Sequence, residues 1–151
     1  MVSDTFRFVS NSEEDTKTLA KKISATLMAG DIVCLSGELG AGKTTFVKGL
    51  AEGLHIKENK VNSPTFVFMN VYSGKKGKNS VELYHFDLYR ATRPEDVFTL
   101  DYEEYFYGQG ICVVEWAERL GPLMPKKYLQ VNFAHQGDQR RAIEVAAVSV
   151  K

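Results

Sequence analysis

A glycine-rich segment constrains what this chain can fold into more than any other part of its sequence. It reads Gly37-Glu-Leu-Gly-Ala-Gly-Lys-Thr44 and matches G-x-x-x-x-G-K-[ST] at every fixed position. An apolar run over 31–36, long enough for a buried strand, comes directly before it. After it, apolar residues recur at helical spacing from Phe46 to Leu54. This order of strand, loop and helix predicts a phosphate-binding loop in an α/β fold.

The residue types of the loop suit the phosphates of a nucleotide. Glycines 37, 40 and 42 let the backbone turn and bring its N–H groups close to phosphate oxygens. Lys43 adds a full positive charge for the β- and γ-phosphates, and the Thr44 hydroxyl is placed to ligate Mg²⁺. We therefore predict that Gly37, Gly40, Gly42, Lys43 and Thr44 bind a nucleotide.

The sequence favours ATP over GTP. A Ras-like GTPase reads guanine with N-K-x-D, and the nearest string, Asn59-Lys-Val-Asn62, lacks the acidic residue. No Asp of the chain is followed by Gly three residues later, so the D-x-x-G switch is also absent.

Two carboxylates are candidates for the chemistry. Glu115 ends the apolar run Ile111–Val114, where a second magnesium-binding carboxylate is expected, although an ordinary surface Glu would fit the same pattern. In His85-Phe-Asp-Leu-Tyr-Arg90 the alternation puts His85, Asp87 and Tyr89 on one strand face. Asp87 would orient water or metal and His85 would hold Asp87; a purely structural network at the strand end is an equal alternative.

Thr65 is a third candidate. It lies in Asn62-Ser-Pro-Thr-Phe66. This segment comes after the helix that follows the phosphate loop, where a Thr can sense the γ-phosphate. Ser-Pro turns are common, so this segment alone is a weak signal.

The remaining pattern predicts an α/β fold in one domain over 1–151: a mixed sheet flanked by helices, like that of P-loop NTPases, with antiparallel hairpins in the C-terminal half. We expect a helix that starts at Ser12 and ends by Gly30. A hairpin is expected from strands 65–72 and 81–87 around a turn over 73–80, and a closing pair from 128–133 and 142–150.

The charge balance and the cysteines limit the kinds of protein that this chain can be. Lys plus Arg and Asp plus Glu are 19 each, so a polyanion-binding surface over the whole protein is excluded. The basic tip Lys75, Lys76 and Lys78 is interpreted as solvated, with contact to tRNA or an acidic partner as the minor alternative. Cys34 and Cys112 lie in apolar runs and indicate free thiols. With no signal peptide or membrane segment visible, we expect a cytoplasmic protein.

Taken together, four segments resemble the TsaE family (older name YjeE) of small bacterial P-loop ATPases. They are Gly37–Thr45, Ser63–Phe66, His85–Arg90 and Val114–Trp116, and they occur in the family's order over nearly the whole chain. The resemblance implies that Gly40, Ala41 and Thr45 also bind ATP phosphates and that Thr44 and Glu115 ligate magnesium. It further implies that Asp87 matters for hydrolysis, that Thr65 is the switch, and that Glu14 to Thr16 and Gly137 contribute to the adenine pocket.

The resemblance also implies a function. The family is needed for threonylcarbamoyl modification of adenosine 37 in tRNAs that read ANN codons; it binds the TsaB–TsaD heterodimer, and ATP hydrolysis resets that complex. Direct contact with tRNA is then expected only through the complex. Aromatic residues around Tyr102, Tyr105, Phe106 and Tyr107 could serve the partner contact, although burial is the commoner fate of aromatics. A small-molecule kinase and a nucleotide sensor without turnover are the alternatives.

Overall fold

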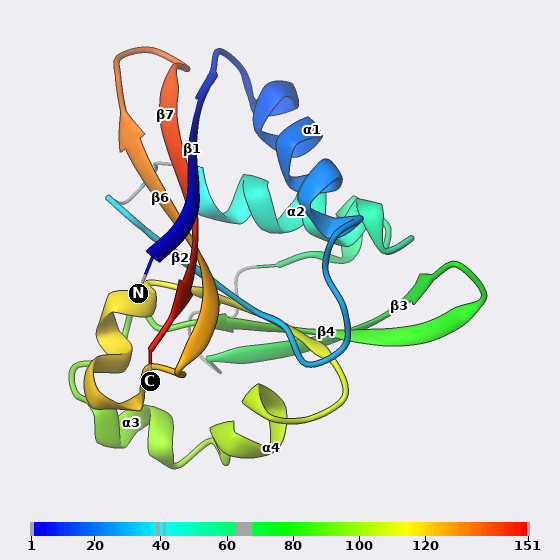
Figure 1. The fold of residues 1–151 in the computed structure, drawn as a ribbon, viewed down its shortest axis with the longest axis vertical. Helices are drawn as coiled ribbons and strands as arrows, with labels where there is room; N and C mark the ends of the chain where they lie inside the picture. The colour runs from blue at the N-terminus through cyan, green and yellow to red at the C-terminus, as the bar shows by residue number, and fades with distance from the viewer. Residues whose placement is uncertain (1, 39, 41, 63–67, 151) are drawn as a thin grey trace.

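The architecture is a mixed sheet with helices on both faces (Figure 1). The computed structural model describes residues 2–38, 40, 42–62 and 68–150. The strands and helices in chain order are β1 (Val2–Ser10), α1 (Glu13–Ser24), β2 (Ile32–Gly37), α2 (Lys43–Gly53), the 3-10 helix η1 (Glu58–Lys60), β3 (Met69–Lys76), β4 (Asn79–Asp87), α3 (Pro94–Phe98), α4 (Tyr102–Phe106), β5 (Ile111–Glu115), the 3-10 helix η2 (Ala117–Leu123), β6 (Lys127–His135) and β7 (Arg141–Ser149). The predicted fold class is confirmed.

The sheet has the strand order β1-β7-β6-β2-β5-β4-β3. Its four middle strands, β6, β2, β5 and β4, are parallel, so their carboxyl ends meet at one edge. The outer strands pair antiparallel, as hairpins β6–β7 and β3–β4 and as the pair β1–β7. In such sheets ligands bind at the carboxyl edge, beside the point where the strand order reverses.

Side chains alternate between two cores. One core lies between the sheet and helices α1 and α2, and the other lies between the sheet and α3, α4 and η2 (Figure 1). Along β2, Val33 and Leu35 enter the first core and Ile32 and Cys34 the second. A central strand buried on both faces explains the unbroken apolar run in the sequence.

The predicted hairpin exists, but its turn is much shorter than expected. Strands β3 and β4 continue to Lys76 and from Asn79, so only Gly77 and Lys78 lie between them. Gly77 has φ 60°, which glycine adopts without strain and which suits a two-residue turn. The first residues of the expected strand, 65–67, lie outside the described residues.

The first helix ends earlier than predicted. Ser12 caps α1 by accepting from the Asp15 amide, as expected, but the helix stops at Ser24, well before Gly30. The Ser24 and Thr26 hydroxyls donate to backbone carbonyls of the last turn, at 2.6 and 2.7 Å. Such side-chain hydrogen bonds compete with the helical ladder and favour its end.

The aromatic segment and the basic tip also differ from expectation. Tyr102 and Phe106 face the second core, and within the named aromatic group only Tyr107 is strongly exposed, at 62%. Lys76 is half-buried and its ammonium donates to the carbonyls of Ser24 and Ala25 at 3.1 and 3.4 Å. The interpretation of the tip as merely solvated is therefore wrong for Lys76, which stabilises the C-terminal end of α1.

Two further expectations concern the cysteines and the membrane. Cys34 and Cys112 are buried free thiols, and burial raises the pKa of each to about 12. Across the described residues, no helix combines the length and the apolar character that crossing a bilayer requires.

Candidate functional site

The candidate site lies at the carboxyl edge of the parallel strands. β2 leads into the glycine-rich loop, β4 ends at Asp87 and β5 ends at Glu115. Asp87 and Glu115 are opposite one another in the register of β4 and β5. Because strand positions alternate, both share the face of Leu83 and Val113, which is the face that α2 covers. The fold therefore brings both predicted carboxylates under the first turn of α2.

The N-terminus of α2 is suited to an anion. Its N-cap, Gly42, has φ 101° and provides no side-chain hydrogen bond to the free N–H groups of the first turn. Among the described α-helices, α2 alone has no acidic residue in its first turn. No carboxylate of the helix itself therefore offsets the partial positive charge at this end, which favours a phosphate.

Lys43 is buried within the loop, with 4% of its surface exposed. Its ammonium donates to the carbonyls of Gly37 at 2.5 Å and Glu38 at 2.8 Å, and lies 4.0 Å from the centre of the Trp116 ring. Burial lowers the pKa of Lys43, and the nearby carboxylates, Glu115 foremost, act in the opposite direction. A bound anion would raise the pKa of Lys43 again and so favour its charged form.

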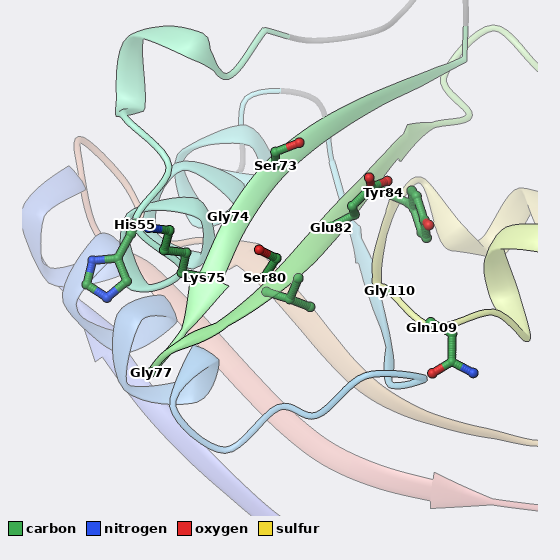
Figure 2. Close-up of a pocket in the computed structure, with 11 residues that line it drawn as sticks. His55, Ser73, Gly74, Lys75, Gly77, Ser80, Glu82, Tyr84, Gln109 and Gly110 are labelled. Atoms are coloured by element: carbon green, nitrogen blue, oxygen red, sulfur yellow. The ribbon is translucent and has the colours of Figure 1, made fainter.

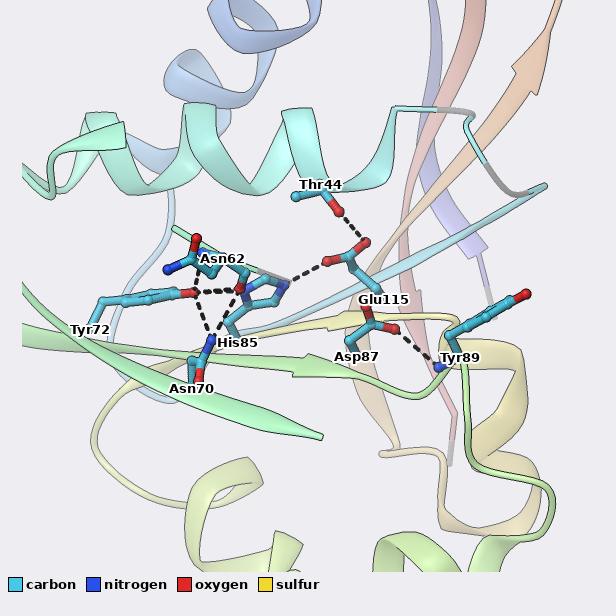
Figure 3. A network of polar contacts seen from close by, with 8 residues as sticks. All are labelled: Thr44, Asn62, Asn70, Tyr72, His85, Asp87, Tyr89 and Glu115. Carbon is cyan, nitrogen blue, oxygen red and sulfur yellow. Dashed lines mark hydrogen bonds and ion pairs between the residues drawn. The ribbon is translucent and has the colours of Figure 1, made fainter. Parts of the chain in front are cut away.

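Glu115 is at the centre of a buried network (Figure 3). Its Oε1 accepts from the Thr44 hydroxyl at 2.9 Å, and its Oε2 lies 2.6 Å from Nε2 of His85. The prediction that His85 holds Asp87 is therefore wrong: His85 holds Glu115. The cause is the sheet order, which places β5 next to β4.

Asp87 is buried next to Glu115 and has other partners. Its Oδ1 accepts from the backbone N–H of Tyr89 at 3.0 Å (Figure 3). β4 ends at Asp87, so the prediction that Tyr89 continues the same strand face is wrong. Tyr89 instead follows the strand and its ring lies 5.2 Å from that of Trp116.

A cavity of about 440 Å³ joins these groups. Its lining contains the predicted residues Gly40, Gly42, Lys43, Thr44, Thr45, Asp87 and Glu115, together with Glu13, Tyr89 and Trp116. Trp116 also contacts the Lys43 ammonium, which lies over its ring. The predicted Gly37 is not among the lining residues of this cavity, and a Cβ at this position would lie 2.7 Å from the Phe133 carbonyl oxygen.

A smaller cavity of about 150 Å³ adjoins the loop on the side of α1 and β7. Thr16, Gly42 and Thr45 line it, together with Gln139 and Arg141, which the sequence reasoning missed. Arg141 reaches the loop directly, because its Nη2 donates to the Gly40 carbonyl at 3.1 Å. The lining of these two cavities does not include Glu14 or Gly137. Ala41 and Thr65 lie outside the described residues.

The donor set at the loop fits magnesium. Thr44 and Glu115 offer a hydroxyl and a carboxylate oxygen, and Mg²⁺ is commonly held by one or two such groups together with water and phosphate. In the described part of the chain no three His, Cys, Asp or Glu side chains converge as metal ligands. A metal held by Thr44 and Glu115 would take its other ligands from water and bound phosphate.

A larger cavity, of about 900 Å³, lies along the β3–β4 hairpin (Figure 2). Its lining residues include His55, Ser73, Lys75, Glu82 and Gln109, and none of the residues of the glycine-rich loop. Size alone therefore does not identify the site; the convergence of a buried lysine, two buried carboxylates and an uncapped helix N-terminus does.

Comparisons with known proteins agree with this geometry. A family model described as "Threonylcarbamoyl adenosine biosynthesis protein TsaE" matches residues 10–143. The TsaE protein of Bacillus subtilis is 44% identical over 135 residues, which cover 89% of this chain and 81% of that protein. The TsaE protein of Treponema pallidum is 41% identical over 140 residues, which cover 93% and 99%.

The fold also matches a solved structure. The crystal structure of Bacillus subtilis YdiB aligns with a TM-score of 0.79 and 37% sequence identity, and the match covers 99% of this chain and 88% of that one. The phosphate-loop geometry, the family model and the relatives together show that this chain belongs to the TsaE family and has its P-loop fold.

Proposed function

We propose that this protein binds ATP with Mg²⁺ at the glycine-rich loop and hydrolyses it. The observation that carries the proposal is the meeting of Lys43, Asp87 and Glu115 in one cavity beneath an uncapped helix N-terminus. A lysine and free backbone N–H groups suit the phosphates, and the carboxylates suit a metal and water. Each group is buried or half-buried, so electrostatic interactions there are weakly screened.

Lys43 binds the phosphates in this proposal. Its ammonium now donates to two carbonyls of the loop itself, and these bonds are exchanged for phosphate oxygens when ATP binds. Burial lowers the pKa of the Lys43 ammonium, and the negative phosphate oxygens stabilise its charged form. The amides at the start of α2 bind further phosphate oxygens.

Thr44 and Glu115 hold the magnesium ion, which when bound neutralises charge on the phosphate oxygens. The hydrogen bond between their side chains already places both oxygens together. Asp87, opposite Glu115 in the sheet, would orient the attacking water or the metal. Thr65 remains the proposed sensor of the γ-phosphate.

The base is adenine in this proposal. The small cavity beside the loop is lined from α1 and from the connection that leads into β7, the two regions that the family resemblance implicates. Thr16 and Arg141 line it, so the adenine pocket is proposed to involve these residues more than Glu14 or Gly137.

The names of the relatives concern tRNA threonylcarbamoyladenosine biosynthesis. We propose that this chain acts in the cytoplasm as the accessory ATPase of that pathway. It binds TsaB and TsaD, and hydrolysis resets their complex between rounds of modification at adenosine 37. Contact with tRNA occurs only through the complex.

Calorimetric titration with ATP and Mg²⁺ tests the binding site. Lys43→Ala should weaken ATP binding by about 10- to 100-fold, the effect expected for a lost hydrogen bond to a charged group. Lys48→Ala, on the same helix but outside the cavity lining, is the matched control and should bind as wild type does. Equal affinity of Lys43→Ala and wild type would contradict the proposed site.

Phosphate release tests the activity. We expect slow release by the protein alone and faster release when TsaB and TsaD are added. ATP binding without release, in the presence or absence of these partners, would instead favour a nucleotide sensor. A phosphorylated small molecule in place of free phosphate would favour a kinase.

A further inference from the structure

A continuous line of polar contacts leads from the proposed magnesium site along one face of the sheet to the edge strand β3 (Figure 3). From Thr44 and Glu115 it passes to His85, whose ring is fully buried. Nδ1 of His85 lies 3.0 Å from the hydroxyl of Tyr72 on β3. Neither Tyr72 nor the edge strand β3 contributes to the lining of the cavity at the loop.

The hydrogens of this network can be assigned from the available partners. An ionised Glu115 accepts a hydrogen bond, so Nε2 of a neutral His85 carries the hydrogen and Nδ1 is the acceptor. Among the described residues, the Tyr72 hydroxyl is the one donor within hydrogen-bond distance of Nδ1. Glu115 therefore places the hydrogen on Nε2, and the Tyr72 hydroxyl supports the same ring form by donating to Nδ1.

Tyr72 is itself held in place. Its oxygen lies 3.3 Å from the backbone nitrogen of Asn62 and 3.1 Å from the Asn62 carbonyl. That carbonyl also accepts from the Asn70 amide at 3.1 Å, so it does not depend on the single hydrogen of Tyr72. The hydroxyl hydrogen is thus available to His85.

We propose that Tyr72 is a positioning residue for the metal site: through His85 it fixes the Glu115 carboxylate that holds magnesium. The proposal rests on the proposed function of Glu115. Removing a group that orients a metal ligand commonly lowers metal affinity or activity about 10- to 100-fold. Tyr72 is one hydrogen bond further from the metal than His85 is. We therefore expect a loss near the lower end of that range, roughly tenfold.

The first test reads the His85 ring without any nucleotide. Tyr72→Phe keeps the aromatic ring and removes the hydroxyl. Tyr102→Phe is the matched control, because both tyrosines are 8% exposed and Tyr102 lies in the core on the opposite face of the sheet. Nitrogen NMR distinguishes the two ring forms, and with three histidines in the chain the His85 signals are readily assigned.

We expect hydrogen on Nε2 of His85 in all three proteins, and a shifted Nδ1 resonance only in Tyr72→Phe, where Nδ1 loses its hydrogen-bond donor. An unchanged His85 spectrum in Tyr72→Phe would overturn the proposal. This result is obtained on nucleotide-free protein, so it tests the contact of Tyr72 with His85 separately from ATP binding, whose failure would refute the proposed function.

The second test measures magnesium dependence. The Mg²⁺ concentration that half-saturates nucleotide binding should rise roughly tenfold in Tyr72→Phe, with unchanged affinity for ATP without metal and no change in Tyr102→Phe. If Tyr72 acts through His85, its substitution should have no further effect in a His85→Asn background. Additive effects, or a loss of metal-free ATP affinity, would mean a general packing role and would overturn the proposal.

Discussion

The close crossing of α1 and α2 determines where the phosphate-binding helix lies, and Gly49 is the residue that permits it. A Cβ added at Gly49 would lie 2.6 Å from the Lys17 carbonyl oxygen and 2.7 Å from the Ala20 Cβ. Both contacts are with groups held on α1, so no flexible side chain can move aside. We therefore predict that Gly49→Ala destabilises the protein, although alanine favours a helix.

The size of the effect follows from two opposing contributions. Overpacking a core costs about 1–3 kcal/mol, and backbone contacts this short belong at the upper end. Replacing Gly by Ala inside a helix recovers about 1 kcal/mol. The net loss in the free energy of unfolding is therefore about 2 kcal/mol, which for a chain of this size lowers Tm by roughly 4–8 °C.

Thermal and urea unfolding of Gly49→Ala test this reasoning. Lys48→Ala is the control, because it changes the neighbouring residue of α2 at a half-buried position and should stay within about 0.5 kcal/mol of wild type. A Gly49→Ala protein as stable as wild type, or more stable, would show that helix propensity exceeds the cost of the crossing and would refute the argument.

Three further predictions concern the site, the basic tip and the cysteines. Glu115→Gln should abolish the stimulation of nucleotide binding by Mg²⁺ in calorimetry while leaving metal-free binding within about twofold, since the metal depends on that carboxylate. Lys76→Met should lower the free energy of unfolding by about 1 kcal/mol through the loss of its bonds to the end of α1, whereas Lys78→Met should have no effect in urea unfolding. The pKa of Cys34 and Cys112 is raised to about 12 in the fold, against about 8.5 in an unfolded chain, so stability present below about pH 8.5 should be lost as pH rises toward the folded value. Unfolding midpoints that stay level across this alkaline range would contradict the last prediction.

Local sequence patterns predicted the features that depend on local structure. The loop motif fixes Lys43 and Thr44 at the start of a helix, because the motif itself contains the strand-to-helix turn. Glu115 was predicted from its place at the end of an apolar run, and the structure puts it at the carboxyl end of β5. Two-residue periodicity correctly placed His85 and Asp87 on one face.

Features that depend on which strands are neighbours could not be predicted in this way. His85 contacts Glu115 because β4 lies beside β5, and Tyr72 reaches His85 because β3 is the edge strand next to β4. Arg141 contacts Gly40 across 101 residues of sequence, and no motif marks it. The sheet order brings these residues together.

The aromatic segment illustrates a different difficulty. Tyr102 and Phe106 are four residues apart and therefore share one face of α4, which packs on the second core. Tyr107, next in sequence, points away from that core and is exposed. Composition indicated a cluster of aromatics, but only the orientation of the helix determines which of them are available to a partner.

The measurement that tests the central claim most directly is a crystal structure with magnesium and a non-hydrolysable ATP analogue. We expect the triphosphate within hydrogen-bond distance of the Lys43 ammonium and of the first amides of α2, with the metal on Thr44 and Glu115. Density for the analogue in another cavity, such as the one along the β3–β4 hairpin, with Lys43 still bonded to the Gly37 and Glu38 carbonyls, would contradict the account.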